Sequence, residues 1–221
     1  MCFALLAGPL AAQSKDSGRA STGVDATLDR AMKTYEKAKS TRASFEQVLT
    51  NPLTGSTANA KGEILMDRPH KLSVRFTDPS GDRIVADGVS LWVYLPSQNP
   101  TQVFRLPQGK SGMGGVDVIG QFFDSPRERF NISDAGVARI GAIATHAIKL
   151  VPKKPSGPFA KATVWVDDTN GQLRQFEVTD ANGLVRRVTL TKVETNVKID
   201  ADNFRFVAPK GARILDGAPS V

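Results

Sequence analysis

The stretch Gly62–Pro96, GEILMDRPHKLSVRFTDPSGDRIVADGVSLWVYLP, decides the fold of this chain. Apolar and polar residues alternate along it, and clusters of Pro, Gly and Asp interrupt the alternation. This pattern is typical of short antiparallel strands joined by tight turns. We therefore expect a sheet with one apolar face and one face toward solvent. The predicted strands are Gly62–Asp67, Lys71–Thr77, Arg83–Ala86 and Ser90–Leu95, with turns at Asp78–Asp82 and Asp87-Gly88.

The same alternation continues on both sides of this meander. Two further hairpin turns are predicted at Asp167–Gly171 and Ala181–Gly183. We expect one continuous antiparallel sheet with helices on one side, which is an α+β fold. The additional predicted strands are Ser44–Thr50, Thr101–Leu106, Phe130–Asp134, Val137–Ile140, His146–Val151, Ala162–Val166, Leu173–Thr179 and Leu184–Val193.

An amphipathic helix is predicted over Val24–Ser40. Leu28, Met32 and Tyr35 recur at helical spacing, and charged residues cover the remaining surface. The narrow apolar stripe favours a helix docked on its own sheet, and the alternative is a helix that binds a partner.

A second helix is predicted over Val116–Phe123, after the glycine-rich segment Pro107–Gly115. A short apolar helix on a flexible hinge resembles a lid, and the alternative is a buried crossover helix. The Gly-Lys-Ser within the segment is not a phosphate-binding loop, because Phe104 stands where that motif requires glycine.

The first twelve residues, MCFALLAGPLAA, resemble the hydrophobic region and cleavage site of a secretory signal, with the cut before Gln13. They lack the usual charged start and are too short to span a bilayer. Residues 13–23 are small and polar and are expected to form a flexible lead, followed by a single domain over 24–221. Cys2 is the only cysteine, and only Met1 precedes it, so lipid modification of this chain is not expected.

Composition and motifs argue against catalysis. The two histidines, His70 and His146, lie far apart and have no neighbouring set of metal ligands. Asp167-Asp168 resembles a carboxylate pair, but it falls in a predicted turn where Asp is favoured for backbone reasons. We therefore expect no catalytic, cofactor or metal site. The net charge of +7 is scattered without a basic-aromatic motif, so nucleic-acid binding is not expected; the charge indicates a solvated surface or a weak preference for anionic membranes.

Several of these segments, in this order, resemble the LolA-type periplasmic carriers of outer-membrane lipoproteins. The matching pieces are Ala43–Gln47 (ASFEQ), Arg68-Pro69 after an apolar strand, the L-x-V-x-F strand at Leu72, and IVADG followed by LWVY. A closing F-x-F-x-x-P-x-G begins at Phe204. The resemblance implies an unclosed half-barrel, a single curved antiparallel sheet whose concave face is covered by helices.

The family resemblance also implies a function. It implies a monomeric periplasmic carrier that binds lipoprotein acyl chains in a hydrophobic cavity, receives them from an inner-membrane loading complex and delivers them to an outer-membrane receptor. In this family the arginine of Arg-Pro reaches the helical lid and locks it closed, so Arg68 is the predicted lock; a simple strand-end arginine is the alternative. An envelope-stress sensor of the same fold and a carrier of another amphiphile, such as a glycolipid, remain alternative functions.

The acyl-chain cavity is expected to be lined by apolar strand and lid residues, although the sequence does not indicate which strand face turns inward. The candidates are Ile64, Met66, Leu72, Val74, Phe76, Leu91, Val93, Val118, Ile119, Phe122 and Phe123.

Overall fold

The computed structural model describes residues 18–108, 117–154 and 159–217. The strands of this part of the chain form one open 12-stranded sheet in the order β12-β6-β5-β4-β3-β2-β1-β11-β10-β9-β8-β7. This confirms the predicted fold class. The strands are β1 (Ser40–Thr50), β2 (Thr57–Asp67), β3 (Lys71–Asp78), β4 (Ser80–Asp87), β5 (Ser90–Tyr94), β6 (Gln102–Pro107), β7 (Phe130–Ile140), β8 (Ile143–Pro152), β9 (Lys161–Asp167), β10 (Leu173–Thr179), β11 (Val185–Thr195) and β12 (Arg213–Asp216).

Several strands are longer than the sequence pattern predicts. The expected turn at Asp78–Asp82 is wrong in length, because Thr77 already pairs with Ser80 and the ladder continues to a tight turn. The two strands predicted between Phe130 and Ile140 are one strand with a bulge. Gly136 in this bulge has a φ of 87°, and its N–H donates to the Asp134 carboxylate at 2.6 Å.

Helix α1 spans Gly18–Lys37, whereas the sequence predicts Val24–Ser40. The N-terminal difference places part of the predicted flexible lead within the helix. At the other end Ser40 joins β1, where it pairs with Asp67, so the chain is extended before the predicted helix end. The predicted apolar stripe is confirmed: Leu28 is fully buried, and Met32 and Tyr35 pack against the core. The predicted signal segment 1–12 lies outside the described residues.

The second predicted helix is much shorter than expected. Helix α2 is a single turn, Gly120–Phe123, and helix α3 follows at Pro126–Arg129. Asp124 adopts an extended backbone and Ser125 a left-handed one, so the two turns cannot merge into a longer helix. Most of the predicted hinge, with Val116, lies outside the described residues.

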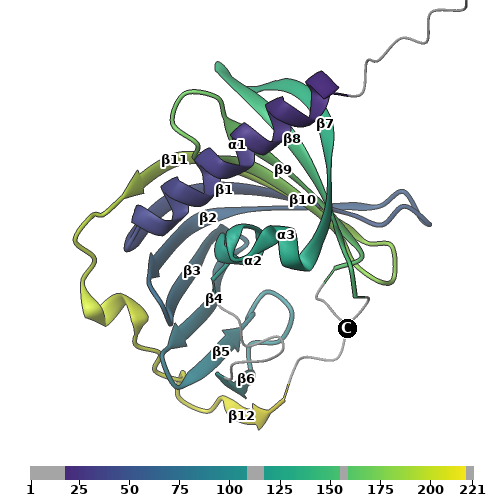
Figure 1. Cartoon of the computed structure of the whole chain (residues 1–221). Coiled ribbons are helices and arrows are strands. Elements are labelled where there is room, and N and C mark those ends of the chain that lie inside the picture. The colour runs from purple at the N-terminus through teal and green to yellow at the C-terminus, as the bar shows by residue number, and fades with distance from the viewer. Residues whose placement is uncertain (1–17, 109–116, 155–158, 218–221) are drawn as a thin grey trace, which may run out of the picture.

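The three α-helices of the described residues lie on one side of the sheet, in the hollow of its curve (Figure 1). We call this side the concave face. Side chains of α1 and α2 pack there with alternate residues of the strands and form one continuous core. Helix α1 crosses the half of the sheet that contains β7–β11, and α2 lies nearer the centre (Figure 1). The core members from α1 and α2 are Val24, Leu28, Ala31, Phe122 and Phe123.

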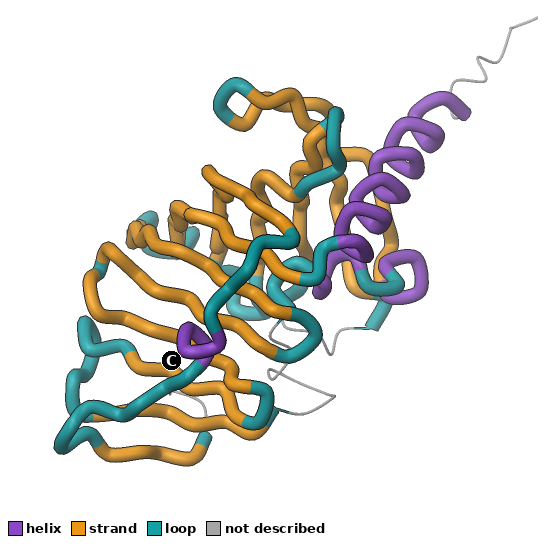
Figure 2. Tube along the Cα trace, turned by 90° about the vertical axis from the view of Figure 1, so that its left-hand side faces the viewer, coloured by secondary structure: helices purple, strands orange, loops and turns teal. Residues whose placement is uncertain are grey.

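The opposite, convex face of β3–β5 is covered by the C-terminal segment. A 3₁₀ turn at Ala201–Phe204 buries Phe204, and the ring of Phe206 stacks on Trp92 with centroids 5.4 Å apart. The segment ends in β12, which the sequence does not predict and which pairs with β6 in parallel. The expectation of a wholly antiparallel sheet is therefore wrong at this edge. Figure 2 shows the segment running along the outside of the strands.

The carboxylate of Asp167 has a structural role in the β9–β10 hairpin. It accepts hydrogen bonds from the backbone and hydroxyl of Thr169 and from the guanidinium of Arg174 at 2.8 Å. Burial raises the pKa of this carboxyl, but these donors outweigh burial and hold the pKa below its usual range. Both partners are largely buried, so the pair fixes a turn that contacts α1.

We predict that Asp167→Asn lowers the free energy of unfolding by about 2–4 kcal/mol at pH 7, because the buried Arg174 loses its counter-ion. The native pKa is depressed, so the stabilisation is present above the unfolded pKa of about 3.9 and is lost as the pH falls through the native pKa. Urea unfolding at pH 7 and pH 3 measures this, and the difference from the unmutated protein should shrink at pH 3. Asp168→Asn is the control; an equal effect there would contradict the assignment.

Candidate functional site

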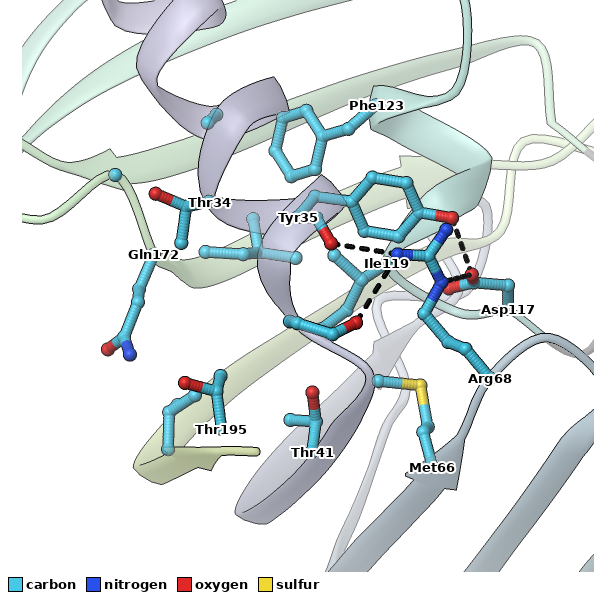
Figure 3. Close-up of a pocket in the computed structure, with 15 residues that line it drawn as sticks. Thr34, Tyr35, Thr41, Met66, Arg68, Asp117, Ile119, Phe123, Gln172 and Thr195 are labelled. Carbon is cyan, nitrogen blue, oxygen red and sulfur yellow. Dashed lines mark hydrogen bonds and ion pairs between the residues drawn. The ribbon is translucent and has the colours of Figure 1, made fainter. Parts of the chain in front are cut away.

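Arg68 connects the end of β2 to the C-terminal end of α1. Its guanidinium donates hydrogen bonds to the carbonyl oxygens of Tyr35 at 2.8 Å and Ala38 at 3.3 Å (Figure 3). The last carbonyls of a helix have no partner within the helix and carry its partial negative charge. A guanidinium supplies hydrogen bonds to these carbonyls because it offers several donors, and it balances their partial negative charge because it stays positively charged.

Tyr35 and Asp117 complete a cluster around this guanidinium. The Arg68 guanidinium carbon lies 3.9 Å from the centroid of the Tyr35 ring, and the Tyr35 hydroxyl donates to Asp117 at 2.6 Å. The same Asp117 oxygen lies 3.4 Å from Nε of Arg68, an ionic contact without hydrogen-bond geometry. We call Tyr35, Arg68 and Asp117 the Arg68 cluster. It joins three parts of the fold: β2, α1 and the segment that leads into α2.

The Arg68 cluster also fixes the position of α2. The second oxygen of Asp117 accepts the N–H of Gly120 at 2.6 Å, at the first residue of α2. A Cβ atom at Gly120 would collide with the Tyr35 hydroxyl and the Asp117 carboxylate. Only glycine therefore allows α2 to approach α1 this closely without displacing the cluster.

Burial raises the pKa of the Tyr35 phenol, and its hydrogen bond to Asp117 acts in the same direction. The positive charge of Arg68 opposes this rise only in part. The phenol therefore remains a neutral donor at physiological pH. An uncharged donor, a cation and a carboxylate meet here at the edge of an apolar core.

Two further sets of contacts hold α1 against the rest of the molecule. Arg127 of α3 pairs with Asp25 at 3.3 Å and with Asp29 at 2.9 Å, both on α1. The hydroxyl of Thr34 donates to the carbonyl of Asn170 at 2.8 Å, in the β9–β10 hairpin. Helix α1 is thus tied by polar contacts along its length as well as by its buried apolar stripe.

A small cavity of about 30 Å³ lies beside the Arg68 cluster. This volume admits one or two water molecules and is far too small for an acyl chain. In this conformation the helices therefore leave no room for an acyl chain beside the Arg68 cluster. The cavity is lined mainly by residues of α1, α2 and the central strands, including Ala31, Tyr35, Ala38, Met66, Arg68, Asp117, Ile119, Phe123, Leu173 and Val193.

The structure places the predicted cavity residues of the strands on one face. Cross-strand pairing aligns Ile64, Val74 and Val93 in one row, through Ile84. Trp92 and Tyr94 project to the convex side instead and pack on Phe206. Four of the predicted strand residues are buried in the core cluster: Ile64, Met66, Leu72 and Val74. Phe76 and Leu91 are partly buried against this cluster. Val93 is buried but lies outside it.

The four predicted lid residues lie against the same core. Phe122 and Phe123 are buried, and Val118 and Ile119 are partly buried. Of all the predicted lining residues, Met66, Ile119 and Phe123 border the small cavity. Asp117 gave no sequence signal, because a single Asp beside a glycine-rich segment has many ordinary roles. The sequence pattern predicts Leu173 and Val193 in strands but not at the cavity, because their position there depends on the packing of distant segments.

His146 contributes to packing near the start of α1. Its ring nitrogen lies 3.0 Å from the Asp134 carboxylate, and its side chain is mostly buried. Across residues 18–108, 117–154 and 159–217, no group of three or more potential ligands is arranged to hold a metal ion. In the same ranges no helix is long and apolar enough to cross a bilayer.

Comparison with known proteins gives a consistent assignment. The family model described as "Outer membrane lipoprotein carrier protein LolA" matches residues 36–110 and 130–207. The outer-membrane lipoprotein carrier protein of Serratia proteamaculans is 29% identical over 90% of this chain and 93% of its own length. That of Leptothrix cholodnii is 28% identical over 81% of each chain. An uncharacterized conserved protein from Thermus thermophilus shares the fold, with a TM-score of 0.54 and 14% identity over 88% of this chain and 99% of its own.

We predict that Tyr35→Phe lowers the free energy of unfolding by about 1–2 kcal/mol, because Asp117 loses a donor at a partly buried site. Urea titration measures this. The loss should be the same between about pH 5 and pH 9, since the Tyr35 phenol does not ionise in that range. Tyr94→Phe is the matched control: its hydroxyl donates to the Pro100 carbonyl at an exposed position, and its removal should cost about 0.5 kcal/mol or less. Equal losses in the two variants would contradict a special role for Tyr35.

Proposed function

Because this chain belongs to the LolA family of outer membrane lipoprotein carrier proteins, we propose that it binds the acyl chains of lipoproteins on its concave face and carries them across the periplasm. The observation that carries the proposal is a continuous apolar face covered by helices that polar contacts hold in place. Cargo would be taken up at an inner-membrane loading complex and passed to an outer-membrane receptor by a monomeric carrier. The proposal requires neither a cofactor nor catalysis.

Burial supplies the driving force for binding. Each methylene group removed from water contributes about 0.8 kcal/mol, so ten of them gain about 8 kcal/mol. The receiving surface comprises the predicted lining residues of β2, β3 and β5. In the present conformation the β2 and β3 part of this surface belongs to the same buried core cluster as Leu28 and Phe122 of the helices.

The covering helices therefore compete with the acyl chains for the same face. When cargo enters, α1 or α2 must leave the apolar surface, and the contacts that hold these helices closed must break. The work of opening is subtracted from the gain of cargo burial, so net affinity falls to a level that permits release. This competition supports a carrier rather than a storage protein.

Arg68 is the proposed lock of the closed form. Its hydrogen bonds to α1 and its ionic contact with Asp117 exist only while α1, α2 and β2 lie together. Breaking them on opening raises the free energy of the loaded form. The Arg68 cluster would then favour return of the helices, which expels the cargo at the receptor.

A release assay tests the proposed function. Inner-membrane vesicles with a labelled lipoprotein, its loading machinery and ATP are mixed with the purified protein, and label is sought in the soluble fraction as a complex. Phe76→Glu, which charges a partly buried position on the concave face, should abolish release, whereas Thr77→Glu at the next, exposed position should not. Absence of release together with binding of another amphiphile, or of no lipid, would favour a glycolipid carrier or an envelope-stress sensor instead.

We predict that Arg68→Leu impairs handover more than loading. Losing about 2–3 kcal/mol of closing energy shifts the balance toward the open form by about 30- to 150-fold, so cargo is held more tightly. Transfer of labelled lipoprotein from the preloaded variant to outer-membrane vesicles measures this. Arg105→Leu, which removes an exposed arginine paired with Asp216, serves as control. Unmutated rates of both uptake and handover in the Arg68 variant would refute the lock.

A further inference from the structure

Arginines gather on the convex face, behind the surface proposed for acyl chains. Arg75 of β3 stands directly opposite Arg83 of β4 in the strand register. Like charges in directly opposite positions destabilise a strand pair. The neighbouring carboxylate in this row is Glu63, which lies opposite Arg75 but pairs with Arg42 at 3.7 Å. The row of side chains formed by Glu63, Arg75 and Arg83 across β2, β3 and β4 therefore retains an excess of positive charge.

A groove lies between β4 and the C-terminal segment, beside this arginine pair. It is wide and open to solvent, with a volume of about 480 Å³, and is lined by Arg83, Asp202, Arg205 and Val207. Arg83 and Arg205 are exposed, and in the part of the chain that the structure describes their guanidinium groups make no hydrogen bond or ion pair. Val207 is 74% exposed at the same place. We call Arg75, Arg83, Arg205 and this hollow the arginine groove.

The arginine groove is built on an ordered support. Arg75 donates to the side-chain oxygen of Asn203 at 2.8 Å, while its Nε is buried and has no partner among the described residues. The 3₁₀ turn that carries Asn203 is capped by Asp200 and anchored by buried Phe204. The C-terminal segment thus brings Arg205 to the hollow that Arg83 lines and fixes the side of the groove opposite β4.

We propose that the arginine groove is a second binding site, on the opposite side of the sheet from the acyl-chain face, and that it takes a phosphate group. Guanidinium groups bind phosphate through paired charge-assisted hydrogen bonds, and an anion between Arg83 and Arg205 also relieves the repulsion between Arg83 and Arg75. Asp202, in the same groove, can accept a hydrogen bond from a hydroxyl or ammonium next to the phosphate. A lipid headgroup and free phosphate both have this chemistry.

The first test compares thermal unfolding in sodium phosphate and in sodium chloride of equal ionic strength. Ligand that binds only the native state raises Tm. The unmutated protein should gain several degrees in phosphate, and the double variant Arg83→Gln/Arg205→Gln should lose that gain. Arg139→Gln, which removes one exposed arginine from β7, should keep it. An equal phosphate effect in the double variant, or none in the unmutated protein, would overturn the proposal.

A second measurement separates binding from a merely structural role. In low-salt buffer without phosphate, Arg83→Gln should raise Tm, because it removes the like-charge opposition with Arg75. A lower Tm would mean that Arg83 stabilises the fold by itself and would overturn the proposal.

Sedimentation with phosphatidylglycerol or phosphatidylcholine vesicles identifies the source of the phosphate. Retention on phosphatidylglycerol that added phosphate abolishes, and that weakens at least tenfold in the double variant, assigns a lipid headgroup. A phosphate effect on Tm without retention assigns free phosphate. Neither assay measures lipoprotein release, so their outcome is independent of the proposed carrier function.

Discussion

The contacts of one guanidinium join the end of β2, the C-terminal end of α1 and the segment that leads into α2. Arg68 binds the last carbonyls of α1 and contacts the carboxylate of Asp117 ahead of α2, and its own N–H donates to the carbonyl of Lys39, just before β1. Helices of a single turn, such as α2 and α3, have no intrinsic stability in water. Their placement therefore comes from tertiary contacts, which include the Arg68 cluster for α2 and the ion pairs of Arg127 with Asp25 and Asp29 for α3.

The alternation of side chains along β3–β5 gives this half of the sheet buried residues on both faces instead of one. Leu72 and Val74 join the core under the helices, whereas Ser73 and Val85 lie buried under the C-terminal segment. Helix α1, in contrast, covers the half with β7–β11 from the concave side (Figure 1). The expectation of one apolar and one solvated face thus holds for part of the sheet and fails where the chain folds back over it.

Local patterns in the sequence predicted most strands, the hairpins and the apolar stripe of α1. These features depend on residues that are only a few positions apart in the sequence. The order of the motifs around Arg68 points to this residue, but it does not predict that Arg68 contacts Tyr35 and Asp117. Asp117 reaches Tyr35 across 82 positions of the chain, and β12 meets β6 after more than a hundred residues. Periodicity carries no information about such distant meetings, nor did it show that the second helix would be the single turn Gly120–Phe123.

The C-terminal segment has a mechanical consequence. It runs from the end of β11 behind β3–β5 to the far edge, with Phe204 and Phe206 pressed against the strands and β12 bonded to β6. Because the segment packs across several strands and is hydrogen-bonded at the sheet edge, it resists changes in the curvature of the sheet. In the proposed carrier, room on the concave face would therefore come from movement of the helices against strands that keep their shape.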